Sequence, residues 1–215
     1  DERFNISSIM EREDPRDVFI SGKHKTLSDI KTGLIGSSSP RRQAMIKHMN
    51  SNIKSKEIRG NIQTRLEKLK KEQLDGIILA KSGLIRMGLD HVVTESLNVN
   101  DFVPSPGQGI LCIECLSKND FVIKRIKKVV HVDTEICGAA ERIFARNMDG
   151  DCLSPIGAHA VIEKNLLTIT GYVASIDGTK FIKNKVSGKK DAYEELAEDL
   201  SDVFIKMGSK RMLKC

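Results

Sequence analysis

GLIGSSSPRRQAMIKHMN, residues 33–50, begins with a short apolar run and continues, after three serines and a proline, into a helical pattern. The apolar run predicts a strand over 33–36, and the later spacing predicts a helix over 41–50. Ser39 is suited to cap this helix, and Pro40 suits its first position, where a missing N–H costs nothing. A strand followed at once by a capped helix is typical of α/β sheets.

The same order continues on the C-terminal side of this stretch. Strand patterns at 53–58 and 75–80 alternate with helical patterns at 61–73 and 84–88. The short connections favour parallel βαβ units with helices on both faces of the sheet. The segment PSPGQG at 104–109 then interrupts the pattern, and its prolines and glycines predict a stiff crossing between domains.

The part of the chain after the crossing has a different pattern. We expect a buried strand over 110–115, a basic helix over 121–130 and a longer helix over 133–148 with Asp133 or Thr134 as its cap. An antiparallel meander and a closing helix follow, with expected bounds of 157–162, 166–176, 180–186 and 192–207. The predicted fold class is therefore α/β with a smaller α+β unit at the end.

Composition excludes several classes of protein. Hydrophobic residues make up 40% and charged residues 30% of the 215 residues, which is normal for a chain that buries a core. The longest apolar runs are only a few residues long, whereas a transmembrane helix needs about 20, so we expect no membrane partner. The net charge is +6, but aromatic residues are 4% with no Trp, which argues against a nucleic-acid partner. No secretory signal opens the chain, and we expect a cytoplasmic or plastid location.

The five cysteines form a poor disulfide framework and indicate a reducing compartment. Cys112 and Cys115 form a CxxC, but they lie inside an apolar strand pattern with no second pair at zinc-site spacing. We therefore expect plain buried thiols there and no metal site.

Arginines near strand ends indicate an anion site. Ser37 and Ser39 precede Arg41 and Arg42 at a helix N-terminus, where free N–H groups attract carboxylates or phosphates. Taken alone, this stretch fits an ordinary capped surface helix equally well. Further arginines follow the next two strands in the corresponding places, and Asn61 is placed to cap the second helix; these arginines are Arg59, Arg65 and Arg86. Because ligands of α/β sheets bind beyond the carboxyl ends of the strands, five arginines in one crevice would suit a ligand with several carboxylates.

The loop DGDCLSPIG at 149–157 presents Cys152 between a helix and a strand. The flanking Asp149 and Asp151 should raise the thiol pKa, which argues against a nucleophile that works by turnover. A single covalent attachment is compatible with this setting, and an ordinary core cysteine is the alternative.

Six motifs together resemble the porphobilinogen deaminase (hydroxymethylbilane synthase) family, and the resemblance extends over essentially the whole chain. The motifs are EREDPRDVF (11–19), GSSSPRRQ (36–43), IRGNIQTRL (58–66), DGIILAKSGLIRMG (75–88), PGQG (106–109) and GDCLSPIG (150–157). The resemblance implies a transferase of porphyrin and heme biosynthesis. It would polymerise four porphobilinogen units into the linear tetrapyrrole hydroxymethylbilane with release of ammonia, primed on a dipyrromethane held by a thioether to one cysteine.

The resemblance also implies roles for particular residues. Cys152 would carry the dipyrromethane cofactor covalently. The other cofactor-binding residues would be Ser37, Ser39, Arg41, Arg42, Arg59, Gly60 and Asn61. The residues that bind porphobilinogen would be Arg59, Arg65, Arg86 and Gln108.

The family's layout implies periplasmic-binding-protein-like doubly wound domains and a small α+β C-terminal domain. Residues 10–104 would form domain two and 131–215 domain three, which includes the attachment loop. Residues 1–9 and 105–130 would be a remnant and a return segment of domain one.

The chain departs from the family pattern at its beginning. Family members begin with roughly a hundred further residues, about one small domain, that include an H-S-x-K-D segment with the catalytic aspartate. No such motif occurs here, so the resemblance implies that this aspartate would lie before Asp1, and Asp14 and Asp17 cannot be assumed to replace it. We therefore expect no catalytic residue in this chain and a monomer when complete. The missing N-terminal segment would be either the start of a longer protein or a second chain. The alternative function is a catalytically inert module that binds polycarboxylates.

Overall fold

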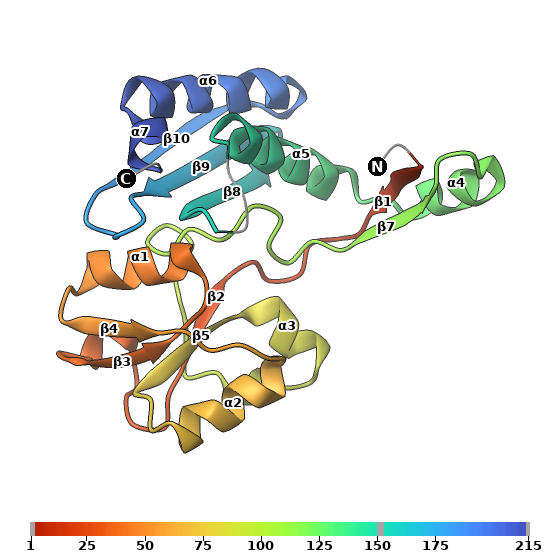
Figure 1. Ribbon diagram of the computed structural model, residues 1–215. Helices are drawn as coiled ribbons and strands as arrows, with labels where there is room; N and C mark the ends of the chain where they lie inside the picture. Colours follow the sequence, from red (N-terminus) through yellow and green to blue (C-terminus); the bar gives the residue numbers. More distant parts are fainter. Residues whose placement is uncertain (1–2, 150–152, 214–215) are drawn as a thin grey trace.

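The structure is a computed structural model that describes residues 3–149 and 153–213, whose strands form three sheets (Figure 1). The largest sheet has the strand order β4-β3-β5-β2-β6. Its strands are β2 (Asp17–Ile20), β3 (Gly33–Gly36), β4 (Ile53–Lys56), β5 (Gly76–Ala80) and β6 (Glu95–Ser96). β3 pairs in parallel with β4 and β5, which confirms the predicted parallel units. β2 is antiparallel to β5 and β6, and the sequence pattern does not predict this part of the sheet.

Helices cover both faces of this sheet, as the α/β class requires. The helices are α1 (Pro40–Met49), α2 (Ile62–Lys71) and α3 (Lys81–Arg86), with short 3-10 turns η1 (Leu27–Asp29) and η2 (Asp90–Val92). Successive strand residues point to opposite faces, so Phe19 and Ile35 pack in one cluster with side chains of α1. Val18 and Ile77 pack in another cluster with side chains of α2 and α3. α3 starts directly at the end of β5, three residues earlier than the sequence pattern predicts.

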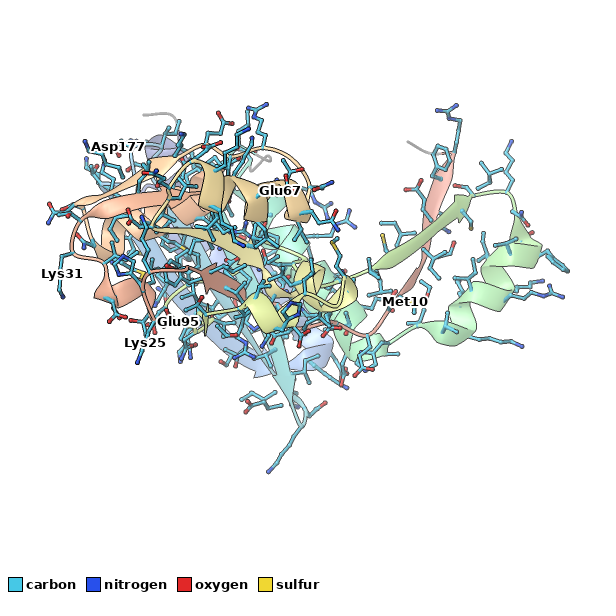
Figure 2. The ribbon with its side chains drawn as sticks, turned by 90° about the horizontal axis from the view of Figure 1, so that it is seen from below. Met10, Lys25, Lys31, Glu67, Glu95 and Asp177 are labelled. Atoms are coloured by element: carbon cyan, nitrogen blue, oxygen red, sulfur yellow. The ribbon has the colours of Figure 1, made fainter. Side chains whose placement is uncertain are left out.

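A two-stranded ribbon stands away from the rest of the molecule, and Met10 lies near its base (Figure 2). It consists of β1 (Phe4–Ile9) paired antiparallel with β7 (Cys112–Leu116), and α4 (Asp120–Ile126) and η3 (Lys127–Val129) follow it. The expectation of a buried strand here is wrong, because among the described strands only β1 pairs with β7, and every residue of β7 is exposed or half-buried. The expected buried thiols are wrong for the same reason, since Cys112 is exposed and Cys115 is only half-buried.

The C-terminal unit is the predicted antiparallel meander, in the order β10-β9-β8, packed against two helices. Its elements are α5 (Val132–Asn147), β8 (Ile156–Glu163), β9 (Leu166–Ala174), β10 (Phe181–Lys189), η4 (Lys190–Ala192), α6 (Tyr193–Lys206) and α7 (Ser209–Met212). The cap of α5 is neither Asp133 nor Thr134. His131 is the cap, because its Nδ1 accepts a hydrogen bond from the Thr134 backbone N–H at 3.3 Å. The fold class, α/β with a small α+β C-terminal domain, is confirmed.

The C-terminal sheet packs against α1 and against the segment 104–109, which is called the Pro-Gly crossing below. Tyr172 and Ala174 of β9 share a core cluster with Ala44 of α1 and Phe102. The backbone N–H of Ala158 donates to the carbonyl of Pro104 at 2.9 Å, so the crossing continues the edge of the sheet at β8. Among the described helices, none is long and apolar enough to cross a membrane.

Candidate functional site

A buried carboxylate lies between the two adjacent arginines at the start of α1. Asp17 Oδ1 accepts hydrogen bonds from Arg42 Nε at 2.9 Å and from Arg42 Nη2 at 2.7 Å. Asp17 Oδ2 lies 2.8 Å from Arg41 Nη1, as an ion pair rather than a well-directed hydrogen bond. Burial alone would raise the pKa of Asp17, but the charges of Arg41 and Arg42 outweigh burial and hold this pKa below its ordinary value. Two guanidinium charges therefore share one carboxylate charge, which leaves one positive charge in excess.

The Pro-Gly crossing is hydrogen-bonded to this cluster. Arg41 Nη1 donates to the carbonyl of Val103, the residue directly before the crossing, at 2.7 Å. Gln108 Nε2 donates to the Pro15 carbonyl at 2.6 Å and to Asp17 Oδ1 at 3.1 Å. The structure thus brings together Arg41, Arg42 and Gln108, three of the residues predicted for the site.

Asp17 is the member of this cluster that the sequence analysis leaves without a role. Its position in a strand cannot be read from the motif EREDPRDVF alone. The available signal was the pair of adjacent arginines, because buried charged groups need partners of opposite charge. Adjacent buried arginines would repel each other without an anion, and Asp17 supplies one anion from within the chain.

The serines hold the turn between β3 and α1. Ser39 Oγ accepts from the Arg42 backbone N–H at 3.5 Å, which is the predicted cap, although the contact is long. Ser37 is buried, and its Oγ accepts from the Ser39 backbone N–H at 3.3 Å. Ser38 Oγ donates to the carbonyl of Ile58, which joins this turn to the next one.

The turn between β4 and α2 carries a second group of predicted residues. Asn61 Oδ1 accepts from the Thr64 backbone N–H at 2.9 Å, which confirms Asn61 as the cap of α2. Gly60 has a φ of 123°, and a Cβ there would lie 2.7 Å from a methyl carbon of Thr64, so the turn requires glycine. Arg65 Nε donates to the Gly60 carbonyl at 2.8 Å, which fixes the side chain over this turn.

Arg65 adds a second unbalanced positive charge near Arg42. Burial lowers the pKa of Arg65, and the like charge of Arg42 lowers it further. Within the described residues no carboxylate forms an ion pair with Arg65. Arg65 therefore adds to the excess of positive charge that Arg41 and Arg42 leave.

The other two predicted arginines lie at the surface. Arg59 has a side chain that is 83% exposed and forms an ion pair with Glu57 at 2.7 Å. Arg86 is exposed, and its Nη2 donates to the Gly109 carbonyl at 2.7 Å, next to Gln108. The structure does not place Arg59 with the buried cluster of Asp17, Arg41 and Arg42. Arg86 is linked to that cluster through the crossing, because the residue next to Gly109, Gln108, contacts Asp17.

Cys152, its neighbour Asp151 and Asp1 lie outside the described residues. Cys152 is the predicted attachment residue, and Asp1 is the point before which the catalytic aspartate of the family is expected. The assignment of Cys152 and the place of that aspartate therefore stay predictions from the sequence.

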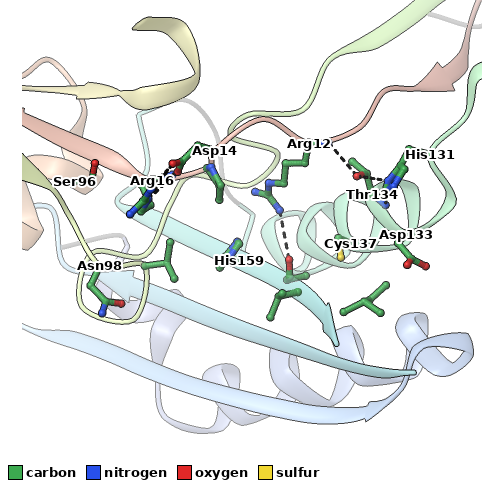
Figure 3. Close-up of a pocket in the computed structure, with 15 residues that line it drawn as sticks. Arg12, Asp14, Arg16, Ser96, Asn98, His131, Asp133, Thr134, Cys137 and His159 are labelled. Atoms are coloured by element: carbon green, nitrogen blue, oxygen red, sulfur yellow. Dashed lines mark hydrogen bonds and ion pairs between the residues drawn. The ribbon is translucent and has the colours of Figure 1, made fainter. Parts of the chain in front are cut away.

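A cavity of about 720 Å³ lies elsewhere, between the segment 12–16, β8 and the start of α5 (Figure 3). Beside it, the buried Glu141 accepts from Arg12 Nη1 at 2.5 Å and from the Gly107 backbone N–H at 2.7 Å. Asp14 lines the cavity and is held by Arg16 Nη2 at 2.6 Å. None of the predicted site residues within the described ranges lines this cavity. No group of three or more His, Cys, Asp or Glu residues in the described ranges could hold a metal ion.

Comparisons with known proteins give consistent matches along the chain. The family model "Porphobilinogen deaminase, dipyromethane cofactor binding domain" matches residues 1–124, and "Porphobilinogen deaminase, C-terminal domain" matches residues 135–206. A porphobilinogen deaminase of Clostridium botulinum (strain 657 / Type Ba4) is 44% identical over 204 residues, which cover 94% of this chain and 69% of the relative. One of Alkaliphilus metalliredigens is 40% identical over 214 residues, which cover 99% of this chain and 68% of the relative.

Solved structures give only distant matches. An arginine-specific periplasmic binding protein of Salmonella typhimurium is 15% identical with a TM-score of 0.37, over 60% of this chain and 59% of its own.

Proposed function

The chain belongs to the porphobilinogen deaminase family, and on this premise we propose how its arginine cluster serves the activity of the family. As a member it is a hydroxymethylbilane synthase, a transferase of porphyrin and heme biosynthesis that uses a dipyrromethane cofactor and the substrate porphobilinogen. The proposed activity is the joining of four porphobilinogen units into hydroxymethylbilane with release of ammonia. The cofactor, when bound, supplies the end to which the first unit is joined.

The observation that carries the proposal is the excess of positive charge at the start of α1 and α2. Arg41, Arg42 and Arg65 contribute three guanidinium charges near one carboxylate, Asp17, which leaves two positive charges for a ligand. Each pyrrole of the cofactor and of the growing chain carries an acetate and a propionate. Guanidinium groups bind carboxylates through two parallel hydrogen bonds, so the donor set suits this cofactor.

The residue roles follow from this arrangement. Arg42 binds carboxylates of the cofactor, and Arg65 binds carboxylates of both the cofactor and porphobilinogen. Asp17 keeps Arg41 and Arg42 in place and balances one of their two positive charges. Ser37, Ser39, Gly60 and Asn61 shape the two turns that bear these arginines. Arg59, Arg86 and Gln108 receive porphobilinogen, and Arg59 exchanges Glu57 for a substrate carboxylate. Cys152 holds the cofactor through a thioether.

We propose four parts for the domain organisation, as implied by the family resemblance. Residues 10–104 form domain two, 131–215 form domain three, and 1–9 with 105–130 belong to domain one. The support is the pairing of β1 with β7, which come from the two ranges assigned to domain one and pair only with each other among the described strands.

A further segment, preceding Asp1, is proposed to cover this ribbon and to supply the acid–base group. Phe4, Ile6, Leu116 and Phe121 on the ribbon and α4 are exposed apolar side chains, which normally have a covering layer. The matched relatives extend beyond the aligned part, since 204 aligned residues are 69% of the relative's length.

Asp14 does not suit the acid–base role. Burial alone would raise its pKa, but hydrogen bonds from Arg16 and Lys81 outweigh burial and hold this pKa far below neutrality. A general acid or base works best with a pKa near the operating pH. Asp14 is therefore not proposed as the acid–base group, which we place in the further segment preceding Asp1.

Substitutions of Arg65 test the proposed site. Arg65→Ala should lower cofactor retention and porphobilinogen affinity about ten- to a hundredfold, as expected for lost hydrogen bonds to a charged group. Arg65→Lys should lower cofactor retention and affinity nearly as much, because a lysine ammonium cannot form the two parallel hydrogen bonds of a guanidinium. Cofactor retention is measured by absorbance and intact mass, and affinity by porphobilinogen consumption in the complete enzyme.

The matched control is Lys70→Ala, which removes a charge from the same helix away from the cluster and should leave both readouts unchanged. Wild-type behaviour of Arg65→Lys would refute the bidentate geometry. A wild-type protein that binds polycarboxylates but neither retains a pyrrole nor consumes porphobilinogen would favour the inert module instead.

A further inference from the structure

Tyr172 is the residue through which the C-terminal sheet reaches the arginine cluster. Along β9, Ile169 and Val173 face α5 and α6. Tyr172 points to the opposite face, into the cluster that contains Met45 of α1 and Phe102. The C-terminal domain therefore contributes an aromatic side chain to the core beneath α1.

Close backbone packing brings Tyr172 and Arg41 to the same part of the crossing. Tyr172 pairs with Gly157 of β8, and a Cβ on Gly157 would lie 2.9 Å from the carbonyl oxygen of Val103. That carbonyl accepts the hydrogen bond from Arg41 Nη1 at 2.7 Å. The Arg41 guanidinium also lies 5.9 Å from the ring centre of Phe102, which belongs to the same cluster as Tyr172.

Both side chains have a buried polar atom without a partner among the described residues. The atoms are Tyr172 Oη and Arg41 Nε, and each residue is only 3% exposed. Burial raises the pKa of Tyr172 and the charge of Arg41 lowers it in part, so the hydroxyl lies within electrostatic range of the guanidinium. The Nε–H group can only donate, and the phenol oxygen can accept, so the two atoms are complementary.

We propose that Tyr172 is a positioning residue for Arg41. Its hydroxyl accepts a hydrogen bond from one buried water that in turn accepts from Arg41 Nε–H, since neither atom has a direct partner among the described residues. The packing of the C-terminal domain against α1 thereby fixes the orientation of an arginine of the anion site. This inference rests on the proposed function only in taking Arg41 as part of that site. It assigns the C-terminal domain a role at the arginine cluster besides carrying Cys152.

The first test measures the hydrogen bond itself and does not depend on activity. Exchange of the Arg41 Nε–H proton with water is followed by NMR in the cofactor-bound protein. Tyr172→Phe removes one oxygen atom and leaves the ring packing in place, and it should speed this exchange at least tenfold. Tyr193→Phe is the matched control, because the Tyr193 hydroxyl contacts Glu194 on α6 instead and its loss should not affect Arg41. Equal exchange in wild type and Tyr172→Phe overturns the proposal.

The second test separates positioning from a purely structural role. The KM for porphobilinogen should rise about three- to tenfold in Tyr172→Phe, a part of what a lost hydrogen bond with a charged donor costs, while kcat and the unfolding midpoint change little. Faster exchange with an unchanged KM would make the contact structural and overturn the positioning role. Failure of the proposed function is distinguishable, because it would appear as normal cofactor retention in Arg65→Ala while the exchange result still stood.

Discussion

Asp17 determines the charge of the cluster at the level of single residues. A lone buried arginine pair would be strongly destabilising, and two carboxylates would leave no positive charge for a ligand. One carboxylate between two arginines satisfies most donors and still leaves the site positive. The cost of burying these charges is offset only while all three partners are present.

Removing this carboxylate should therefore destabilise the protein strongly. Asp17→Asn keeps the shape of the side chain but leaves Arg41 and Arg42 buried without a counter-ion, so the free energy of unfolding should fall by about 3–5 kcal/mol. Urea unfolding measures this loss. Asp202→Asn, at an exposed position on α6, should change stability by less than about 0.5 kcal/mol. A similar small effect for both variants would contradict the assigned role of Asp17.

Asp17 also determines the direction in which the free energy of unfolding changes with pH. The folded pKa of Asp17 is below its unfolded value, which is about 3.9, because the two arginines outweigh burial. The stabilisation is therefore fully present above the unfolded pKa and is lost as the pH falls through the folded pKa. Below about pH 4, the decline of unfolding free energy with falling pH should be shallower in Asp17→Asn than in wild type. An unchanged slope in that variant would contradict the ion-pair assignment.

Residues whose role depends on their sequence neighbours could be predicted correctly from the sequence. Ser39 and Asn61 cap the helices that they were expected to cap, because capping depends on a few neighbouring residues. The partnership of Asp17 with Arg41 and Arg42 depends on an antiparallel strand that pairs across the sheet, and no local pattern encodes it.

At the scale of elements, periodicity succeeded for most strands and helices that have a complete layer beside them, although it did not indicate the buried strand β2. The β8–β9–β10 meander and α6 lie close to their expected bounds, because the packed faces impose a regular pattern on the sequence. β7 shows the limit of this reasoning. Its apolar residues suggest burial, yet only β1 lies beside it among the described strands, and its alternating side chains are exposed or half-buried.

The contact between the crossing and β8 can be tested at Gly157. A Cβ there would lie 2.9 Å from the Val103 carbonyl oxygen and 3.1 Å from that of Pro104, so the backbone must shift to admit it. Gly157→Ala should cost about 1–3 kcal/mol of unfolding free energy, typical of overpacking. Gly22→Ala is the control, since no atom lies within 4 Å of its Cβ and its φ is not positive. Equal denaturation midpoints for the two variants would show that the crossing does not pack as described.

At the scale of the whole molecule, the ribbon of β1 and β7 is the part with the least support. Two strands alone are marginally stable in water. Amides of β1 and β7 should therefore exchange with solvent faster than those of β3 and β5, as measured by hydrogen–deuterium exchange. Adding a segment that corresponds to the unmatched part of the relatives should slow exchange in both ribbon strands. Ribbon amides that exchange as slowly as the large sheet in the present chain alone would argue against a missing layer.

The most direct test of the account as a whole is the intact mass of the purified protein, supplied with the proposed further segment, beside that of Cys152→Ser. The account predicts that wild type carries the added mass of two linked pyrrole units and that Cys152→Ser carries none. The thioether should be found on Cys152, and the other four cysteines should be unmodified. Wild-type protein without the added mass, or with the pyrroles on another cysteine, would contradict the assignment of the cofactor to this chain.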